Sequence, residues 1–147
     1  MEISKNEYSN EFKKAVKMRD NSKFAHSIAI LEDLAKTSWA SKDLNFHLVS
    51  GGVYRSLNDH VQALKCFKKA SILFPESELA SLGLYLSYVK ADKSEKAISE
   101  LKRYLDKYPA KLYKDTLAEL LDDFNSGYAT NFKNTVLSLA KRNKVVL

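Results

Sequence analysis

Histidine and cysteine are the side chains that most often hold metals or act as nucleophiles, and this chain has few of them. Its three histidines, His26, His47 and His60, are isolated, and its single cysteine is Cys66. A metal site needs several such ligands at short spacings, and the sequence has no such cluster. Cys66 stands beside Phe67 in an apolar helical pattern, so we expect a packed thiol rather than a nucleophile.

Paired carboxylates could serve acid–base catalysis, and two adjacent pairs occur. They are Glu32–Asp33 and Asp122–Asp123. Neighbouring residues on a helix point about 100° apart, so such a pair rarely acts on one substrate. The sequence also lacks the glycine-rich loops that cradle phosphates. We therefore expect a protein with no enzymatic activity and no cofactor.

The chain repeats itself with a period of about 34 residues. Its two prolines, Pro75 and Pro109, stand one period apart, and similar residues precede both at matching positions. The matching pairs are Tyr54 and Tyr88, Ala63 and Ala97, Phe67 and Leu101, and Ala70 and Tyr104. A period of this length is typical of stacked helical hairpins, each too small to bury its apolar face alone. The sequence therefore predicts an array of helical hairpins that functions through its surface and not through a catalytic pocket.

Apolar residues at three- and four-residue steps predict the helices of the two central hairpins. The first hairpin is expected to join helices at 44–57 and 60–73 through a turn at Asn58 and Asp59. The second hairpin is expected to begin with a helix at 77–90 that Ser77 caps. Its second helix is expected to start at Asp92 and Ser94 and to end at Pro109. The adjacent glycines Gly51 and Gly52 predict that a neighbouring helix approaches closely.

Degenerate copies of the hairpin are expected at both ends. Upstream, helices are expected near 7–19 and over the stretch from Ser27, and a spacing of about 36 residues to the next unit predicts a small loop insertion. Downstream, a helix near 112–124 is expected to end at Ser126 and Gly127, and Thr130 is expected to cap a last helix. End units of an array are irregular because one face meets water.

These residues resemble the tetratricopeptide repeat family. Six positions of the family pattern are met in residues 44–77, namely Gly51, Tyr54, Ala63, Phe67, Ala70 and Pro75. Residues 78–111 fit at Tyr88, Ala97, Leu101 and Pro109, whereas Tyr85 and Tyr104 replace small residues, and the family's early tryptophan is absent from both copies. The resemblance implies an all-α, right-handed solenoid of about four antiparallel helix pairs. It would form a single domain over 1–147, with repeats at about 7–38, 44–77, 78–111 and 112–142.

The same resemblance implies a concave surface formed by the first helix of each pair. Its expected residues are Asn45, Leu48, Val49, Gly52 and Arg55 in one repeat and Leu79, Leu82, Leu86 and Lys90 in the next, with Ser56, Gly83 and Val89 beside them. Such an apolar trough suits a helix or an extended segment of another protein. Whether its leucines line this groove or pack into the core stays open at this stage.

Composition and charge indicate where the protein works and how its surface is charged. The N-terminal residues have no apolar secretory core and no stretch is long enough to span a bilayer, so with a single cysteine we expect a cytoplasmic protein. The formal net charge is +6, and the lysine-rich stretch 90–114 is expected to be mainly a solvated helix face.

The favoured function is binding of one dedicated protein partner, as by a toxin-neutralising immunity protein, a secretion chaperone or a small adaptor. The alternative is RNA binding by tyrosines interleaved with cations, as in Lys102-Arg103-Tyr104, Lys107-Tyr108 and Lys111-Leu112-Tyr113. Nucleic acid is the less favoured partner, and both a monomer and an oligomer agree with the sequence.

Overall fold

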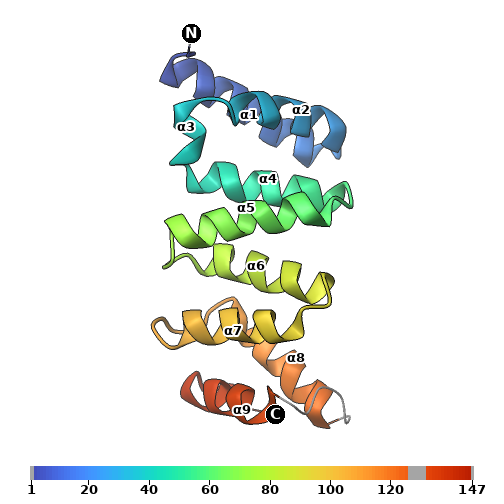
Figure 1. Ribbon diagram of the computed structural model, residues 1–147, viewed down its shortest axis with the longest axis vertical. Helices are drawn as coiled ribbons and strands as arrows, with labels where there is room; N and C mark the ends of the chain where they lie inside the picture. The colour runs from blue at the N-terminus through green and yellow to red at the C-terminus, as the bar shows by residue number, and fades with distance from the viewer. Residues whose placement is uncertain (1, 126–131, 147) are drawn as a thin grey trace. The chain divides into compact units, whose positions relative to one another are not determined.

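The computed structural model describes residues 2–125 and 132–146, and helices form the regular structure of these residues (Figure 1). The all-α fold class predicted from the sequence is confirmed. The chain divides into two compact units, unit 1 (Met1–Phe74) and unit 2 (Pro75–Leu147). The division falls three residues before the predicted border between the two central repeats, and each unit is described by itself.

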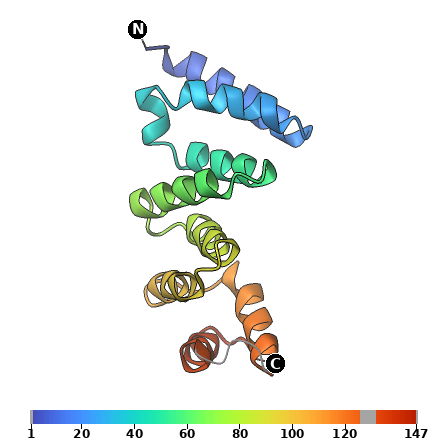
Figure 2. The same cartoon turned by 45° about the vertical axis from the view of Figure 1, so that its right-hand side comes forward.

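Unit 1 consists of two helical hairpins. The first joins α1 (Lys5–Asp20) to α2 (Phe24–Leu34), and the second joins α4 (Leu44–Ser56) to α5 (His60–Leu73). The one-turn helix α3 (Ser38–Ser41) lies between them, where the sequence predicted a small insertion. Helix α2 packs on α4, and Figures 1 and 2 both show the partners of each hairpin side by side.

Unit 2 also contains two helix pairs. Helix α6 (Glu78–Lys90) packs on α7 (Ser94–Leu105), and α8 (Tyr113–Asn125) packs on α9 (Lys133–Arg142). The expected helix end at Ser126 and Gly127 and the expected cap at Thr130 lie outside the described residues. The helix bounds otherwise agree with the predicted ones to within a few residues.

The hairpin turns repeat the same backbone geometry. Ser22, Asn58 and Asp92 each follow a first helix and adopt φ near +60°, and the next residue donates its N–H to a carbonyl four residues before the turn residue. This left-handed turn closes a helix by satisfying its last carbonyls, and Asn and Asp tolerate it better than most residues. The step from the first turn to the second is slightly longer than the step from the second to the third, as the expected insertion requires.

Two expected helix starts are confirmed and one is corrected. Asp59 accepts the Gln62 N–H at 3.2 Å, and Ser77 accepts the Ala80 N–H at 3.1 Å, so both cap their helices. Helix α7 instead has Lys93 at the capping position, and no side chain caps it. Asp92, expected to help open α7, is the residue that forms the left-handed turn before it, so its carboxylate does not cap the helix.

The glycine pair of α4 serves close packing at one position only. A Cβ built on Gly51 would stand 2.8 Å from the Phe67 ring, so α5 approaches α4 there as predicted. A Cβ on Gly52 would meet nothing within 4 Å. The prediction of close approach is therefore right for Gly51 and wrong for Gly52, because successive helical residues face different directions.

A buried core holds the hairpins of unit 1 together. Ala15, Leu31 and Val53 are almost fully buried, and Ser27 donates its hydroxyl to the Ala15 carbonyl oxygen at 2.8 Å. This buried hydrogen bond ties α2 to α1 and satisfies two polar groups that would otherwise be costly. The insertion joins the same core, since the Trp39 indole donates to the Ile3 carbonyl oxygen at 3.0 Å.

Tyr113 is the centre of the unit 2 core. It is fully buried, and its hydroxyl lies 2.7 Å from the buried Ser81 hydroxyl. The Tyr85 ring packs edge-on against it, with 6.0 Å between ring centroids. The Glu78 carboxylate accepts hydrogen bonds of 2.8 to 3.0 Å from the three successive backbone N–H groups that lead into α8. These contacts connect α6 to α8 and fix where α8 begins.

No helix in the described ranges 2–125 and 132–146 is both long and apolar enough to cross a membrane.

Candidate protein-binding surfaces

The predicted concave residues of unit 1 lie on one side of α4, which we call the α4 face: Asn45, Leu48, Val49, Gly52 and Arg55. Asn45 is exposed, Leu48 is half-buried, and Gly52 has open space beyond its Cα. Val49 packs against the unit 1 core, so it helps to hold the helix as well as facing this side. The α4 face is therefore mostly polar or small, with little exposed apolar surface.

Arg55 has a packing role that the sequence did not reveal. Its guanidinium carbon lies 4.9 Å above the centroid of the Phe67 ring, a cation–π arrangement. Burial lowers the pKa of Arg55. The side chain thus covers a core aromatic ring, and a substitution there would disturb the packing of α5 on α4 as well as the surface charge.

The predicted concave residues of unit 2 give a more apolar surface. Leu79, Leu82, Leu86 and Val89 recur at three- and four-residue steps and form what we call the α6 stripe. Leu79, Leu86 and Val89 are 53%, 41% and 48% exposed. Lys90, at the end of α6, is exposed too.

The structure also shows which of the predicted concave residues of α6 are exposed and which pack into the core. Leu82 is half-buried and packs against the unit 2 core. Gly83, which was expected beside the groove, is buried. The open question about the leucines is thus answered for α6, since Leu79 and Leu86 face outward and Leu82 is shared between surface and core.

A hollow of about 270 Å³ lies beside the α6 stripe, among α6, α7 and α8. Leu86 and Val89 line it from α6, and Leu120 lines it from α8. Glu119 and Asp123 add carboxylates to the same lining. An apolar hollow bordered by carboxylates suits a segment that carries both apolar and basic side chains.

The carboxylates that border the hollow affect the pKa of the neighbouring Tyr85. Burial first, and then the charges of Glu119 and Asp123, raise the pKa of Tyr85 to about 12. Tyr85 therefore lines the hollow as a neutral phenol at physiological pH.

The sequence did not lead us to expect Glu119, Leu120 and Asp123 on a binding surface, although Asp123 was expected to be an exposed helix charge. The period offered a signal, because Leu120 stands one full period after Leu86 and so occupies the same position of the next first helix. The signal was hidden because the fourth repeat is degenerate and lacks the proline that marks the two central copies.

The tyrosines proposed for RNA stacking are largely inaccessible. Tyr104 and Tyr113 are buried in the unit 2 core, and Tyr108 packs against Tyr104 with 5.0 Å between ring centroids. A base can stack only on a ring whose face is open. Tyr104 and Tyr113 are therefore closed to base stacking, which weakens the RNA-binding alternative.

Two cations of the basic stretch 90–114 form ion pairs. Arg103 donates two hydrogen bonds, of 2.8 and 2.7 Å, to the buried Glu100 carboxylate. Lys102 and Arg142 both bind the Asp106 carboxylate, at 2.5 and 2.8 Å, and these hydrogen bonds lower the pKa of Asp106. The charges of Lys102 and Arg103 are therefore balanced locally.

The residues that could do metal or nucleophilic chemistry remain dispersed. Within 2–125 and 132–146, no three His, Cys, Asp or Glu side chains come together as metal ligands would. His47 is buried, and its Nε2 lies 3.2 Å from the Ser41 carbonyl oxygen. Burial raises the pKa of the Cys66 thiol to about 11, so the unreactive thiol form dominates at neutral pH.

Comparison with known proteins shows a likeness of fold and no close relative. No family model matches the chain, and no curated protein matches it. Among solved structures, it is similar to the type III secretion translocator chaperone SycD of Yersinia enterocolitica, crystallised as an alternative dimer. The TM-score is 0.63 at 12% sequence identity, and the match covers 98% of this chain and 94% of that chain. At this identity the likeness concerns the fold alone.

Proposed function

We propose that this protein is a non-enzymatic binding module of the chaperone or adaptor type, which holds a segment of another protein on the α6 stripe. The observation that carries the proposal is the row of exposed Leu79, Leu86 and Val89 beside a hollow with an acidic border. Exposed apolar side chains that recur along one side of a helix are typical of interaction surfaces. The fold likeness to a secretion translocator chaperone agrees with this role.

The chemistry of the hollow defines the segment that would bind there. Leu86, Val89 and Leu120 offer an apolar contact, and Glu119 and Asp123 favour lysine or arginine beside it. A short helix or strand of the partner with alternating apolar and basic side chains meets both conditions. On the α4 face, Asn45, Leu48 and Gly52 supply a second, more polar surface of the same kind. The lone Cys66 favours the reducing cytoplasm as the place of binding.

Toxin neutralisation is one special case of this proposal, in which the partner is an enzyme that binding inhibits. A chaperone or adaptor is the broader form, and the same surface would serve either. The net charge of +6 disfavours a strongly basic partner in both cases, although the acidic hollow attracts a locally basic segment.

The proposal is tested by quantitative affinity capture from cells of the native host. Leu86→Glu, which puts a charge into the apolar contact of the α6 stripe, should reduce recovery of the partner at least tenfold. Val61→Glu is the matched control, because Val61 is 65% exposed on α5 and lines neither the stripe nor the hollow. Equal recovery with Leu86→Glu and Val61→Glu, or no specific partner of the wild-type chain, would refute the proposal.

A further inference from the structure

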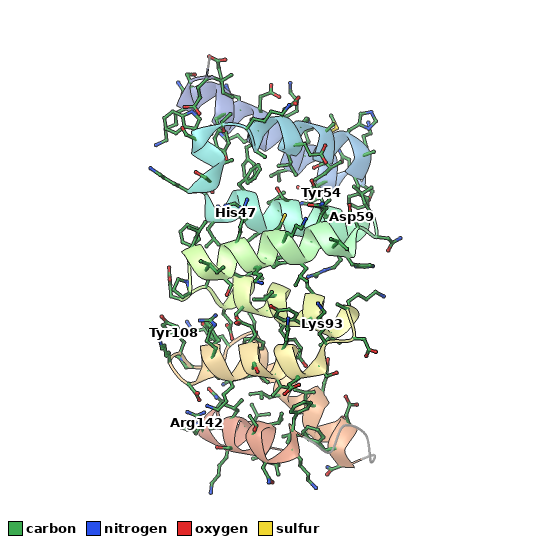
Figure 3. All side chains as sticks on the ribbon, in the orientation of Figure 1. His47, Tyr54, Asp59, Lys93, Tyr108 and Arg142 are labelled. Carbon is green, nitrogen blue, oxygen red and sulfur yellow. The ribbon has the colours of Figure 1, made fainter. Side chains whose placement is uncertain are left out.

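Unit 1 contains a depression that the predicted concave surface does not use. A cleft of about 490 Å³ lies between α2 and α5, with α4 as its floor. The α4 residues in its lining are Phe46, His47, Ser50 and Tyr54, and Figure 3 shows His47 and Tyr54 near opposite ends of the helix. At 100° per residue these positions point away from the α4 face. The cleft is therefore a separate surface.

The cleft carries unbalanced positive charge. Lys65, Lys68 and Lys69 line it from α5, and none of them forms an ion pair with any residue in the described part of the chain. Glu32 is the acidic residue in the lining, and its carboxylate accepts a hydrogen bond from the Tyr54 hydroxyl at 3.0 Å. Three lysines facing one carboxylate leave the cleft ready for an anionic ligand.

A buried polar group in the same wall lacks a partner. The Ser50 side chain is 4% exposed, and its hydroxyl has no hydrogen-bond partner among the described residues. A buried hydroxyl without a partner is costly and calls for an explanation. Because Ser50 lines the cleft, a ligand that brings an acceptor oxygen would supply the missing hydrogen bond.

The shape and the apolar floor indicate the kind of ligand. Ile28, Phe46 and Ile72 line the cleft with apolar side chains, and a smaller hollow of about 270 Å³ continues it past Ile72 to Leu73. The lining follows α5 from Gln62 to Leu73, which is about 16 Å at the rise of a helix. About five residues of an extended chain cover that length, so the groove matches a peptide segment.

We propose that the cleft binds an acidic segment of a partner protein. Its carboxylates contact Lys65, Lys68 and Lys69, and one large apolar side chain between them enters the floor at Phe46 and Ile72. The charge complementarity and the length of the groove both favour a peptide over a compact small molecule. This inference does not depend on the proposed function, because it concerns another face, other residues and a ligand of opposite charge.

The test is a fluorescence anisotropy titration of the purified full chain. The probe is a fluorescein-labelled peptide in which glutamates flank two leucines, and the control probe has glutamine in place of every glutamate. The glutamate peptide should bind at least tenfold more tightly, a difference of about 1.4 kcal/mol. Its affinity should fall as salt is added, because exposed charges are screened.

Matched charge-reversal variants separate a specific site from general attraction. Lys65→Glu with Lys69→Glu should weaken binding of the glutamate peptide at least tenfold. Lys13→Glu with Lys17→Glu makes the same change of charge at the same spacing on exposed α1 positions outside the cleft, and it should weaken binding less than twofold. Equal losses in the two pairs would overturn the proposal.

Cys66 gives an independent readout, because it lines the cleft and is the single cysteine. A saturating amount of glutamate peptide should slow alkylation of Cys66 by iodoacetamide at least threefold, and the glutamine peptide should not. No binding of the glutamate peptide would overturn the proposal. Protection of Cys66 by a fluorescent long-chain fatty acid but not by the peptide would do so too, and would identify the cleft as a small-molecule site.

Discussion

The two adjacent glycines of α4 allow a sharp test of the packing in unit 1. Replacing a glycine in a helix interior by alanine raises the free energy of unfolding by about 1 kcal/mol, provided that there is space for the added methyl group. At Gly52 it does, since nothing lies within 4 Å of the added Cβ. We expect Gly52→Ala to stabilise unit 1 by about 1 kcal/mol.

At Gly51 the same change should have the opposite sign. The added Cβ would stand 2.8 Å from two ring carbons of Phe67, a buried side chain with the Arg55 guanidinium above its ring. Inserting a methyl group into such a packed place costs about 1–3 kcal/mol, which exceeds the gain in helix propensity. We expect Gly51→Ala to destabilise unit 1 by about 1 kcal/mol, so the two variants should differ by about 2 kcal/mol.

The assay is thermal unfolding followed by the fluorescence of Trp39. Trp39 is the single tryptophan and packs against the unit 1 core, so it reports the unit that contains both glycines. For a unit of this size, about 1 kcal/mol shifts the midpoint by roughly 4–8 °C. In a Phe67→Leu background, which removes the ring edge, Gly51→Ala should lose most of its cost. Equal shifts from the two alanine variants would refute the reasoning.

Two further changes test the unit 2 core and the state of the thiol. Tyr113→Phe should destabilise the fold by about 1–3 kcal/mol, because it leaves the buried Ser81 hydroxyl without its 2.7 Å partner. Urea denaturation followed by circular dichroism measures this, and a loss that Ser81→Ala does not partly restore would contradict it. Alkylation of Cys66 should be about a hundredfold slower at pH 8 than for a free cysteine, because its pKa is raised from 9.0 to about 11. The rate should rise about tenfold per pH unit up to pH 10, and a plateau near pH 9 would count against the burial of the thiol.

The helices and their order could be predicted from the sequence because their signals are local. Apolar periodicity, the caps Asp59 and Ser77, and the turn residues Asn58 and Asp92 all act within a few positions of the chain. Local hydrogen bonds and backbone preferences decide such features, so a single sequence contains them. The misassigned cap of α7 shows the limit, since Asp92 suits a left-handed turn as well as a cap.

The candidate surfaces were predicted in part. The family resemblance made Leu79, Leu86 and Lys90 candidates for a concave face, with the leucines open between groove and core, and the structure leaves all three exposed. It could not tell that Leu82 packs into the core or that Arg55 covers Phe67. Those outcomes depend on which side chains of other helices reach the position, and spacing along one helix does not contain that information.

By itself, the sequence determined that this protein is built from helical hairpins, because one period repeats both the apolar positions and the turns between them. Only the tertiary structure decided where ligands could lie. The basic cleft forms because α2 and α5, which are far apart in the chain, leave a gap over α4 that exposes Lys65 and Lys69 and buries the Ser50 hydroxyl in its wall. The physical reason is that the burial and the charge balance of a residue depend on all the residues around it. Packing brings those residues together from distant parts of the chain.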